Sequence, residues 1–233
     1  MSKEVFGLSQ DCLREKNLLP TLGQFHYCEF STFADLLKYW KIFRRGHYNQ
    51  REKVENDPSF QQLIVYGLLV KPDGRFLIYE RGGSNYGEER VTGMTSLGIG
   101  GHIEPDDNKS LAKALYRELW EEIEILIRGE KKEFLHPNQM KTYLQITPIA
   151  LVKDERSSVG EVHFGVVFVV LLKENVDAKV NSENGENRWS EWVTPKGYLE
   201  LINSKQINPE GWAEIVFEKL ISAKTFQNIL NKK

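Results

Sequence analysis

The sequence has few of the features that mark secreted, membrane or nucleic-acid-binding proteins. Its two cysteines, Cys12 and Cys28, are not in metal-ligand spacing, so we expect reduced thiols and no disulfide framework. A secretory leader and an apolar run of about 18 residues are both missing, which indicates a cytoplasmic protein with no membrane partner. The formal net charge of −2 disfavours a general attraction to nucleic acid.

The composition is that of an ordinary globular protein, with 40% apolar and 27% charged residues among 233. From Thr32, apolar residues recur every three or four positions and predict an amphipathic helix that ends near Gly46. We therefore expect an N-terminal extension with one amphipathic helix (1–60), a main domain (61–222) and a C-terminal tail (223–233). An exposed apolar face on that helix would favour a homodimer.

Alternating strand and turn patterns follow this helix. Leu63–Val70, the turn at 71–74 and Arg75–Arg81 predict a hairpin. Three further strands are predicted at Tyr143–Lys153, Val162–Lys173 and Arg188–Val193. The second of these is almost wholly apolar, so it should be central and covered on both faces. Thr194-Pro195 and Asn208-Pro209 then begin two helices. The order predicts an α/β fold in which helices enclose a mixed sheet.

A glycine pair and an acidic helix are the most informative part of the chain. Gly100–Gly101 precede a helix predicted from about Lys109 to Ile127. Three of its carboxylates share an arc of roughly 100°, beside a separate core stripe that includes Ala112; they belong to Glu118, Glu121 and Glu122. Crowded carboxylates repel one another unless a cation lies among them. Oxygen ligands suit Mg²⁺ or Mn²⁺, so the segment predicts a metal site at the rim of the domain.

The residues of this segment resemble the Nudix box. Its family pattern is Gly-x5-Glu-x7-Arg-Glu-U-x-Glu-Glu-x-Gly-U, where U is a bulky aliphatic residue; this chain has Gly101-x5-Asp107-x9-Arg117-Glu118-Leu119-x-Glu121-Glu122. The flanking residues 96–105, 57–60 and 159–165 resemble the branch described as predicted Nudix phosphoesterases. The chain departs from the pattern at Asp107, in a spacer two residues longer, and at Glu124, which stands where the family has glycine. Glu124 suggests that the helix continues past the usual stop.

The resemblance implies a Nudix-type α/β/α sandwich with a mixed β-sheet, preceded here by the N-terminal helical extension. It implies a Mg²⁺-dependent hydrolase, with Mn²⁺ as an alternative ion. Such an enzyme cleaves a phosphoanhydride bond in a nucleoside diphosphate linked to another moiety, or in a similar small pyrophosphate. The implied metal ligands are the Gly100 carbonyl, Glu118, Glu121 and Glu122. Arg117 would orient these groups, and Glu118 or Glu122 would act as general base.

Further acid–base candidates lie outside the box. They are Glu161, His163 and Glu191, since Nudix enzymes often take an acid or base from another loop. Each also has a plain structural interpretation: His163 as an interior strand histidine, Glu161 as an exposed residue at a strand start, and Glu191 as the partner of an arginine.

Substrate-binding candidates surround the glycine-rich segments. Arg81 and Arg90 flank the loop at 82–91, where they would clamp a phosphate or simply face solvent. Gly101 and His102 would contact substrate, or His102 would only shape the turn.

Two other functions remain open at this stage. A non-catalytic Nudix-like module would sense a nucleotide without cleaving it, but such modules usually lose box glutamates and this chain keeps all three. An RNA-directed pyrophosphohydrolase would hold its strand with the basic cluster at 38–51, where a solvated helix face is the favoured interpretation.

Overall fold

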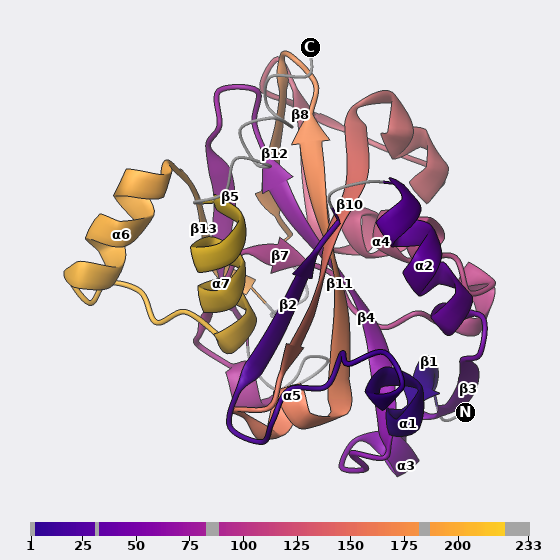
Figure 1. Ribbon diagram of the computed structural model, residues 1–233. Coiled ribbons are helices and arrows are strands. Elements are labelled where there is room, and N and C mark those ends of the chain that lie inside the picture. The colour runs from indigo at the N-terminus through magenta and orange to yellow at the C-terminus, as the bar shows by residue number, and fades with distance from the viewer. Residues whose placement is uncertain (1–2, 31–32, 83–88, 182–186, 222–233) are drawn as a thin grey trace. The chain divides into compact units, whose positions relative to one another are not determined.

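The computed structural model describes residues 3–30, 33–82, 89–181 and 187–221 (Figure 1). The chain divides into two compact units. Unit 1 comprises Met1–Tyr66, Gly100–Leu115 and Pro148–Phe168, and unit 2 comprises the remaining segments, Gly67–Ile99, Tyr116–Thr147 and Val169–Lys233.

Strands and helices alternate along the chain, so the predicted α/β class is confirmed. The strands are β1 (Glu4–Ser9), β2 (Phe25–Glu29), β3 (His47–Gln50), β4 (Phe60–Val70), β5 (Phe76–Arg81), β6 (Thr95–Ser96), β7 (Gly98–Ile99), β8 (Ile123–Ile127), β9 (Glu130–Lys132), β10 (Leu144–Asp154), β11 (His163–Leu172), β12 (Val176–Val180) and β13 (Asn187–Val193). The α-helices are α1 (Gln10–Arg14), α2 (Phe33–Phe43), α3 (Arg51–Val54), α4 (Leu111–Glu122), α5 (Ser158–Val162), α6 (Pro195–Asn203) and α7 (Gly211–Val216).

Short 3-10 helices η1 (Glu89–Val91), η2 (Pro105–Asp107) and η3 (Pro137–Thr142), and a π-helical turn η4 (Phe217–Ile221), complete the described elements. The main hydrogen-bonded strand order is β13-β5-β4-β11-β10-β2, and β12-β8-β9 form a second sheet. No helix in the described ranges is long and apolar enough to cross a membrane.

The first 60 residues contain more structure than the single predicted helix. In unit 1, β1 pairs antiparallel with β3, where Phe6 faces Tyr48, and with β4, where Leu8 faces Gln61. β2 pairs antiparallel with β10. The predicted amphipathic helix is present as α2. The strands beside it were not predicted, because these short segments become strands by pairing with distant parts of the chain. The domain boundary near residue 60 stays a prediction, and the predicted tail at 223–233 lies outside the described residues.

The helix predicted from Thr32 is α2. Tyr39, Ile42 and Phe43 are buried, whereas Leu37 and Trp40 are 47% and 40% exposed. Apolar spacing alone therefore located the helix without orienting it. Dimerisation through this exposed apolar face stays a prediction.

The hairpin and the later strands of unit 2 agree with the sequence pattern. β4 and β5 join where Val70 faces Phe76, and β13 adds to β5 with Glu191 opposite Ile78. The Thr194 side chain caps α6 by accepting a hydrogen bond from the Gly197 amide. β11 lies between β4 and β10 in the strand order and is buried at nine of its ten positions, as its apolar sequence predicts.

Glu124 does not extend the acidic helix. α4 ends at Glu122, and β8 begins at the next residue. Glu124 lies in β8, between β12 and β9. Its carboxylate pairs with Lys131 of β9 at 3.1 Å and with Lys179 of β12 at 2.8 Å. The prediction of a helix continuing to Ile127 was wrong because these cross-strand partners favour a strand, which local propensity does not reveal.

Candidate active site

The glycine pair lies in an extended segment, not in a turn as predicted. The Val65 amide donates a hydrogen bond to the Gly101 carbonyl at 3.0 Å, and His102 forms a bridge with Ile64 of β4. A Cβ at Gly100 would collide with the Val65 carbonyl oxygen. Glycine is thus required at Gly100 for close approach to β4 in unit 1.

The two additional spacer residues are absorbed before α4. Asp107 is buried and accepts a hydrogen bond from the Glu104 amide at 2.9 Å, which closes the turn η2. Asn108 and Lys109 then adopt left-handed conformations, with φ of 52° and 59°. Asparagine tolerates this region better than most residues. The longer spacer therefore changes the entry to the helix and leaves its Arg-Glu-x-x-Glu-Glu sequence on regular helical turns.

The helix α4 has the predicted buried stripe, with two corrections. Ala114, Leu115 and Leu119 are fully buried, but Ala112, which was assigned to the core, is exposed. The acidic stripe is not wholly at the rim either, since Glu118 is only 8% exposed. A carboxylate at this depth carries a desolvation cost that an exposed helix face would not impose.

Arg117 holds two of the three glutamates of α4 in unit 2. Its Nη1 donates to Glu118 Oε1 at 2.7 Å and to Glu121 Oε2 at 3.3 Å. The i,i+4 pairing with Glu121 is the one that the helix periodicity predicts, whereas the pairing with the adjacent Glu118 was not anticipated. Arg117 thereby orients the acidic side chains, in line with the role implied by the resemblance.

Burial and crowding perturb the Glu118 carboxyl. Burial is the main cause that raises the pKa of Glu118 to about 7, and the charge of Glu121 adds to it, while Arg117 and a hydrogen bond with the Glu122 side chain oppose the increase. Two carboxyl groups can share a hydrogen bond only when one of them is protonated. The hydrogen bond between Glu118 and Glu122 therefore requires a proton on one of these two carboxyl groups.

The donor chemistry of this cluster suits a hard divalent cation. Its side chains offer carboxylate oxygens, the ligands that Mg²⁺ and Mn²⁺ prefer. Within the part of the chain that the structure describes, no group of three or more His, Cys, Asp or Glu side chains converges as a metal site. The carboxylate oxygens are thus of the type that binds such an ion. In this structure, Glu118 and Glu121 accept hydrogen bonds from Arg117.

A buried carboxylate that sequence analysis missed lies beside Arg81 in unit 2. Glu210 is 6% exposed, accepts a hydrogen bond from Ser96 Oγ at 2.5 Å, and has its Oε2 3.9 Å from Arg81 Nη1. The backbone places it there, because the Glu210 amide donates to the Thr95 carbonyl. Burial chiefly raises the pKa of nearby Tyr79, with smaller contributions from Glu122 and Glu210. No local motif marks Glu210, so only the tertiary contact reveals it.

Two further candidates, Arg90 and Glu191, also lie in unit 2. Arg90 lies exposed in η1. Glu191 lines a shallow cavity of about 600 Å³ between β13 and α6, together with Arg75 and Thr194. The pairing of Glu191 with an arginine stays a prediction.

The histidine candidates meet in unit 1. The rings of His102 and His163 lie 5.3 Å apart. His102 Nε2 bonds Gln62 Oε1 at 2.8 Å, which supports its structural interpretation. His163, 5% exposed, bonds the Val159 carbonyl at 2.7 Å through Nδ1, so this nitrogen carries the proton.

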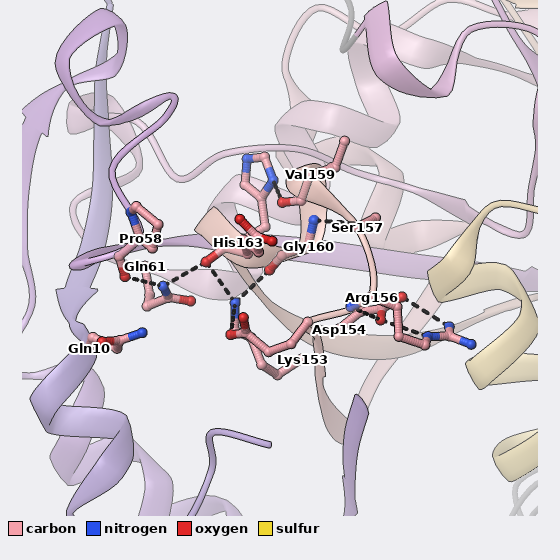
Figure 2. A network of polar contacts seen from close by, with 12 residues as sticks. Gln10, Pro58, Gln61, Lys153, Asp154, Arg156, Ser157, Val159, Gly160 and His163 are labelled. Atoms are coloured by element: carbon pink, nitrogen blue, oxygen red, sulfur yellow. Dashed lines mark hydrogen bonds and ion pairs between the residues drawn. The ribbon is translucent and has the colours of Figure 1, made fainter. Parts of the chain in front are cut away.

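Glu161 lies in the helical turn α5 and not at a strand start, because β11 begins only at His163. Its backbone carbonyl accepts hydrogen bonds from both Lys153 and Gln61 (Figure 2). The side chain is half-buried, so the prediction of a simply exposed residue was too general.

Internal pairing occupies part of the basic cluster. Arg45 forms an ion pair with Glu15, and Arg51 pairs with Glu55 at 3.0 Å. These contacts agree with the interpretation of the segment as a solvated protein surface. Both Cys12 and Cys28 are free thiols.

Comparison with known proteins identifies the family of this chain. The family model described as NUDIX domain matches residues 61–211. Protein YmaB of Bacillus subtilis (strain 168) is 34% identical over 194 residues, which cover 78% of this chain and 82% of YmaB. The crystal structure of Tm1382, a protein assigned to the Nudix hydrolases, is similar with a TM-score of 0.61 at 22% identity, over 97% of this chain and 100% of Tm1382. DR0079 from Deinococcus radiodurans is 17% identical, with a TM-score of 0.49, over 84% and 99% of the two chains. The sequence match and the Arg-Glu-x-x-Glu-Glu helix agree, and the chain therefore belongs to the Nudix family of hydrolases, enzymes that cleave pyrophosphate bonds.

Proposed function

We propose that this Nudix hydrolase cleaves a phosphoanhydride bond in a nucleoside diphosphate linked to another moiety, or in a related small pyrophosphate, and that it requires Mg²⁺ or Mn²⁺. The observation that carries the proposal is the buried carboxyl of Glu118, whose pKa is raised to about 7 beside two further glutamates. Burial disfavours the charged form of the Glu118 carboxyl, and a cation bound beside it would favour that form.

The metal ligands in this proposal are the side chains of Glu118, Glu121 and Glu122. To bind an ion, Glu118 and Glu121 exchange their contacts with Arg117 for the ion. The Gly100 carbonyl stays a ligand implied by the resemblance. When bound, the ion supplies charge neutralisation at the phosphate oxygens and lowers the pKa of a bound water.

Other side chains of unit 2 bind and orient the substrate in this proposal. Arg81 contacts a phosphate through its guanidinium, which the Glu210 carboxylate holds from one side. Arg117 orients Glu118 and Glu121 before the ion binds. Glu118 or Glu122 accepts a proton from the attacking water, the role implied by the resemblance.

Unit 1 supplies the candidate acid or base outside the box. We assign this role to Glu161, whose half-buried carboxylate is carried by a turn with a firmly held backbone. His163 is the second candidate, with Nε2 as its basic nitrogen because Nδ1 donates to Val159. Gly101, His102 and Arg90 remain proposed substrate contacts, and a small-molecule nucleotide or pyrophosphate is the proposed partner.

The test is a turnover screen with purified protein. Nucleotide sugars, dinucleoside polyphosphates and ADP-ribose are incubated with Mg²⁺, Mn²⁺ or chelator, and phosphate-containing products are measured. We expect metal-dependent turnover of one class and its loss in Glu122→Gln.

Glu124→Gln is the matched control for this screen. It removes a carboxylate two positions away that pairs only with lysines outside the cluster in the described contacts, so turnover should be retained. Metal-independent turnover, or equal activity in Glu122→Gln, would contradict the proposed metal site. Binding without turnover across the whole panel would instead support a sensing module.

A further inference from the structure

A fully buried lysine lies at the end of β10 and is not explained by the box. Lys153 has an exposed fraction of 0%. Its Nζ donates to the carbonyl oxygens of Gly160 at 2.5 Å and Glu161 at 2.9 Å, and it pairs with Glu155 Oε1 at 2.9 Å (Figure 2). An ammonium has three N–H donors, and these three acceptors match them.

Such a burial is costly unless each donor is satisfied. Burial lowers the pKa of Lys153, and the hydrogen bond and charge of Glu155 oppose that decrease. Two of the three hydrogen bonds of the ammonium are made with backbone carbonyls of α5. The lysine thus acts mainly on the position of that backbone.

The segment that Lys153 holds does not stabilise itself. α5 is a single turn of five residues, far below the length at which a helix is stable alone. Ser157 caps it by accepting from the Gly160 amide at 3.1 Å. A Cβ at Gly160 would collide with the Asp154 carbonyl oxygen, so the turn lies tightly against the end of β10.

A second buried side chain binds the same carbonyl group. Gln61 of β4 donates through Nε2 to the carbonyls of Pro58 at 2.6 Å and Glu161 at 2.9 Å. The Glu161 carbonyl therefore accepts hydrogen bonds from both Lys153 and Gln61. Figure 2 shows the two donor side chains pointing toward the same region. Two donors on one carbonyl fix the peptide plane, and with it the direction in which the Glu161 side chain leaves the backbone.

We propose that Lys153 is a positioning residue for hydrolysis: it binds the carbonyl oxygens of Gly160 and Glu161 and thereby fixes the backbone that carries Glu161, the proposed acid or base. This inference rests on the proposed role of Glu161. Lys153 itself contacts neither substrate nor metal in this assignment. Gln61 binds the same Glu161 carbonyl, and its removal should lower kcat less than the removal of Lys153.

The principal test is a double-mutant cycle between Lys153→Met and Glu161→Gln, read as kcat and KM at saturating Mg²⁺. Misplacement of a catalytic group by about 1 Å can cost about 100-fold in rate, so we expect Lys153→Met to lower kcat by about 10- to 100-fold with KM nearly unchanged. In the Glu161→Gln background, Lys153→Met should change kcat less than twofold, because the group that it positions is already gone.

Lys71→Met is the matched control. Lys71 is also largely buried, pairs with Asp177 at 2.8 Å and lies over the Trp192 ring, but it holds no segment with a proposed catalytic group. We expect it to lower the melting temperature and leave kcat unchanged. Hydrogen exchange of the amides in 157–163 gives a readout independent of turnover, and it should accelerate in Lys153→Met and not in Lys71→Met.

Gln61→Leu keeps the proposal testable if Lys153→Met does not fold. It removes the second donor to the Glu161 carbonyl and should lower kcat severalfold, again only when Glu161 is present. Equal losses of kcat for either variant with and without Glu161 would overturn the inference. So would an unchanged kcat in Glu161→Gln while Glu122→Gln is inactive, a result that leaves the proposed hydrolase function intact. Inactivity of the parent protein on every substrate would contradict the proposed function, and with it the inference that rests on it.

Discussion

Two buried charged side chains, Glu118 in unit 2 and Lys153 in unit 1, have opposite surroundings. Glu118 lies beside Glu121 and Glu122 and shares Arg117 with Glu121, and burial is the main cause that raises its pKa to about 7. Lys153 is buried more completely, yet each of its three donors has an acceptor. Burial alone therefore does not determine whether a charged side chain has its hydrogen bonds satisfied.

The difference separates the proposed metal site from a contact that holds the fold. A carboxylate cluster with excess negative charge becomes more stable when a cation arrives, which suits metal binding. A lysine with all donors satisfied gains nothing from a ligand and instead orders the backbone that it contacts. Removal of the two side chains should consequently have opposite effects on stability.

The largest expected effect is on turnover in Glu118→Gln. Loss of a carboxylate that is a proposed metal ligand and candidate base should lower kcat by about 100- to 1000-fold. The same change should leave the melting temperature unchanged or raise it, because the amide removes a desolvated charge. Steady-state kinetics and thermal unfolding without metal test both parts. A large fall in stability would show that Glu118 is structural, like Lys153.

Lys153→Met should show the reverse effect on stability. Breaking a buried charged network by removal of one partner typically costs about 3–5 kcal/mol, so we expect the free energy of unfolding to fall by about that amount. Denaturant unfolding at neutral pH measures it. Gln61→Leu serves as the milder companion, since it removes two hydrogen bonds from the same network without leaving a charge behind. An unchanged free energy of unfolding in Lys153→Met would contradict the structural role that distinguishes Lys153 from Glu118.

The pH dependence of stability should identify Glu118 directly. Its folded pKa of about 7 lies above the ordinary 4.5, so the folded protein binds more protons than the unfolded chain between these values. Stability without metal should therefore fall as pH rises from 4.5 to 7, by about 3 kcal/mol relative to Glu118→Gln. Melting temperatures of both proteins across this range give the difference. A difference independent of pH would contradict the raised pKa.

The smallest expected effect concerns Glu124, a partly buried glutamate that is balanced by cations. Hydrogen bonds with Lys179 and Lys131 lower its pKa, so its contribution is present above the ordinary pKa and is lost as pH falls through the lower folded value. Because both lysines are about half exposed, Glu124→Gln should cost only about 0.5–1 kcal/mol at pH 7. Chemical denaturation at pH 7 and pH 3 measures this loss, which should disappear at the lower pH.

Sequence pattern located the long elements well where their periodicity was strong. The hairpin of β4 and β5, the central apolar β11 and the Thr194 cap of α6 were all predictable, because local propensity and buried environment agree there. The strands of residues 1–60 were missed. β1 and β2 carry weak local signals and become strands by pairing with β4 and β10.

In the acidic helix α4, too, local periodicity predicted some features and missed others. Helical periodicity predicted that Arg117 would reach Glu121, and it does. The periodicity did not predict the end of α4 at Glu122, since Glu124 finds its lysine partners on neighbouring strands. It also placed Glu118 at the rim, although the surrounding chain buries it.

By itself, the sequence determined the family, the helix that carries Arg117 and the three glutamates, and the chemical type of the site. Those properties depend on residue types at short spacing, which the chain carries in any conformation. Only the tertiary structure decided that Glu118 is buried with a raised pKa, that Glu210 lies beside Arg81, and that Lys153 holds the turn α5. Burial and long-range contacts arise from segments far apart in the chain, and no local pattern encodes them.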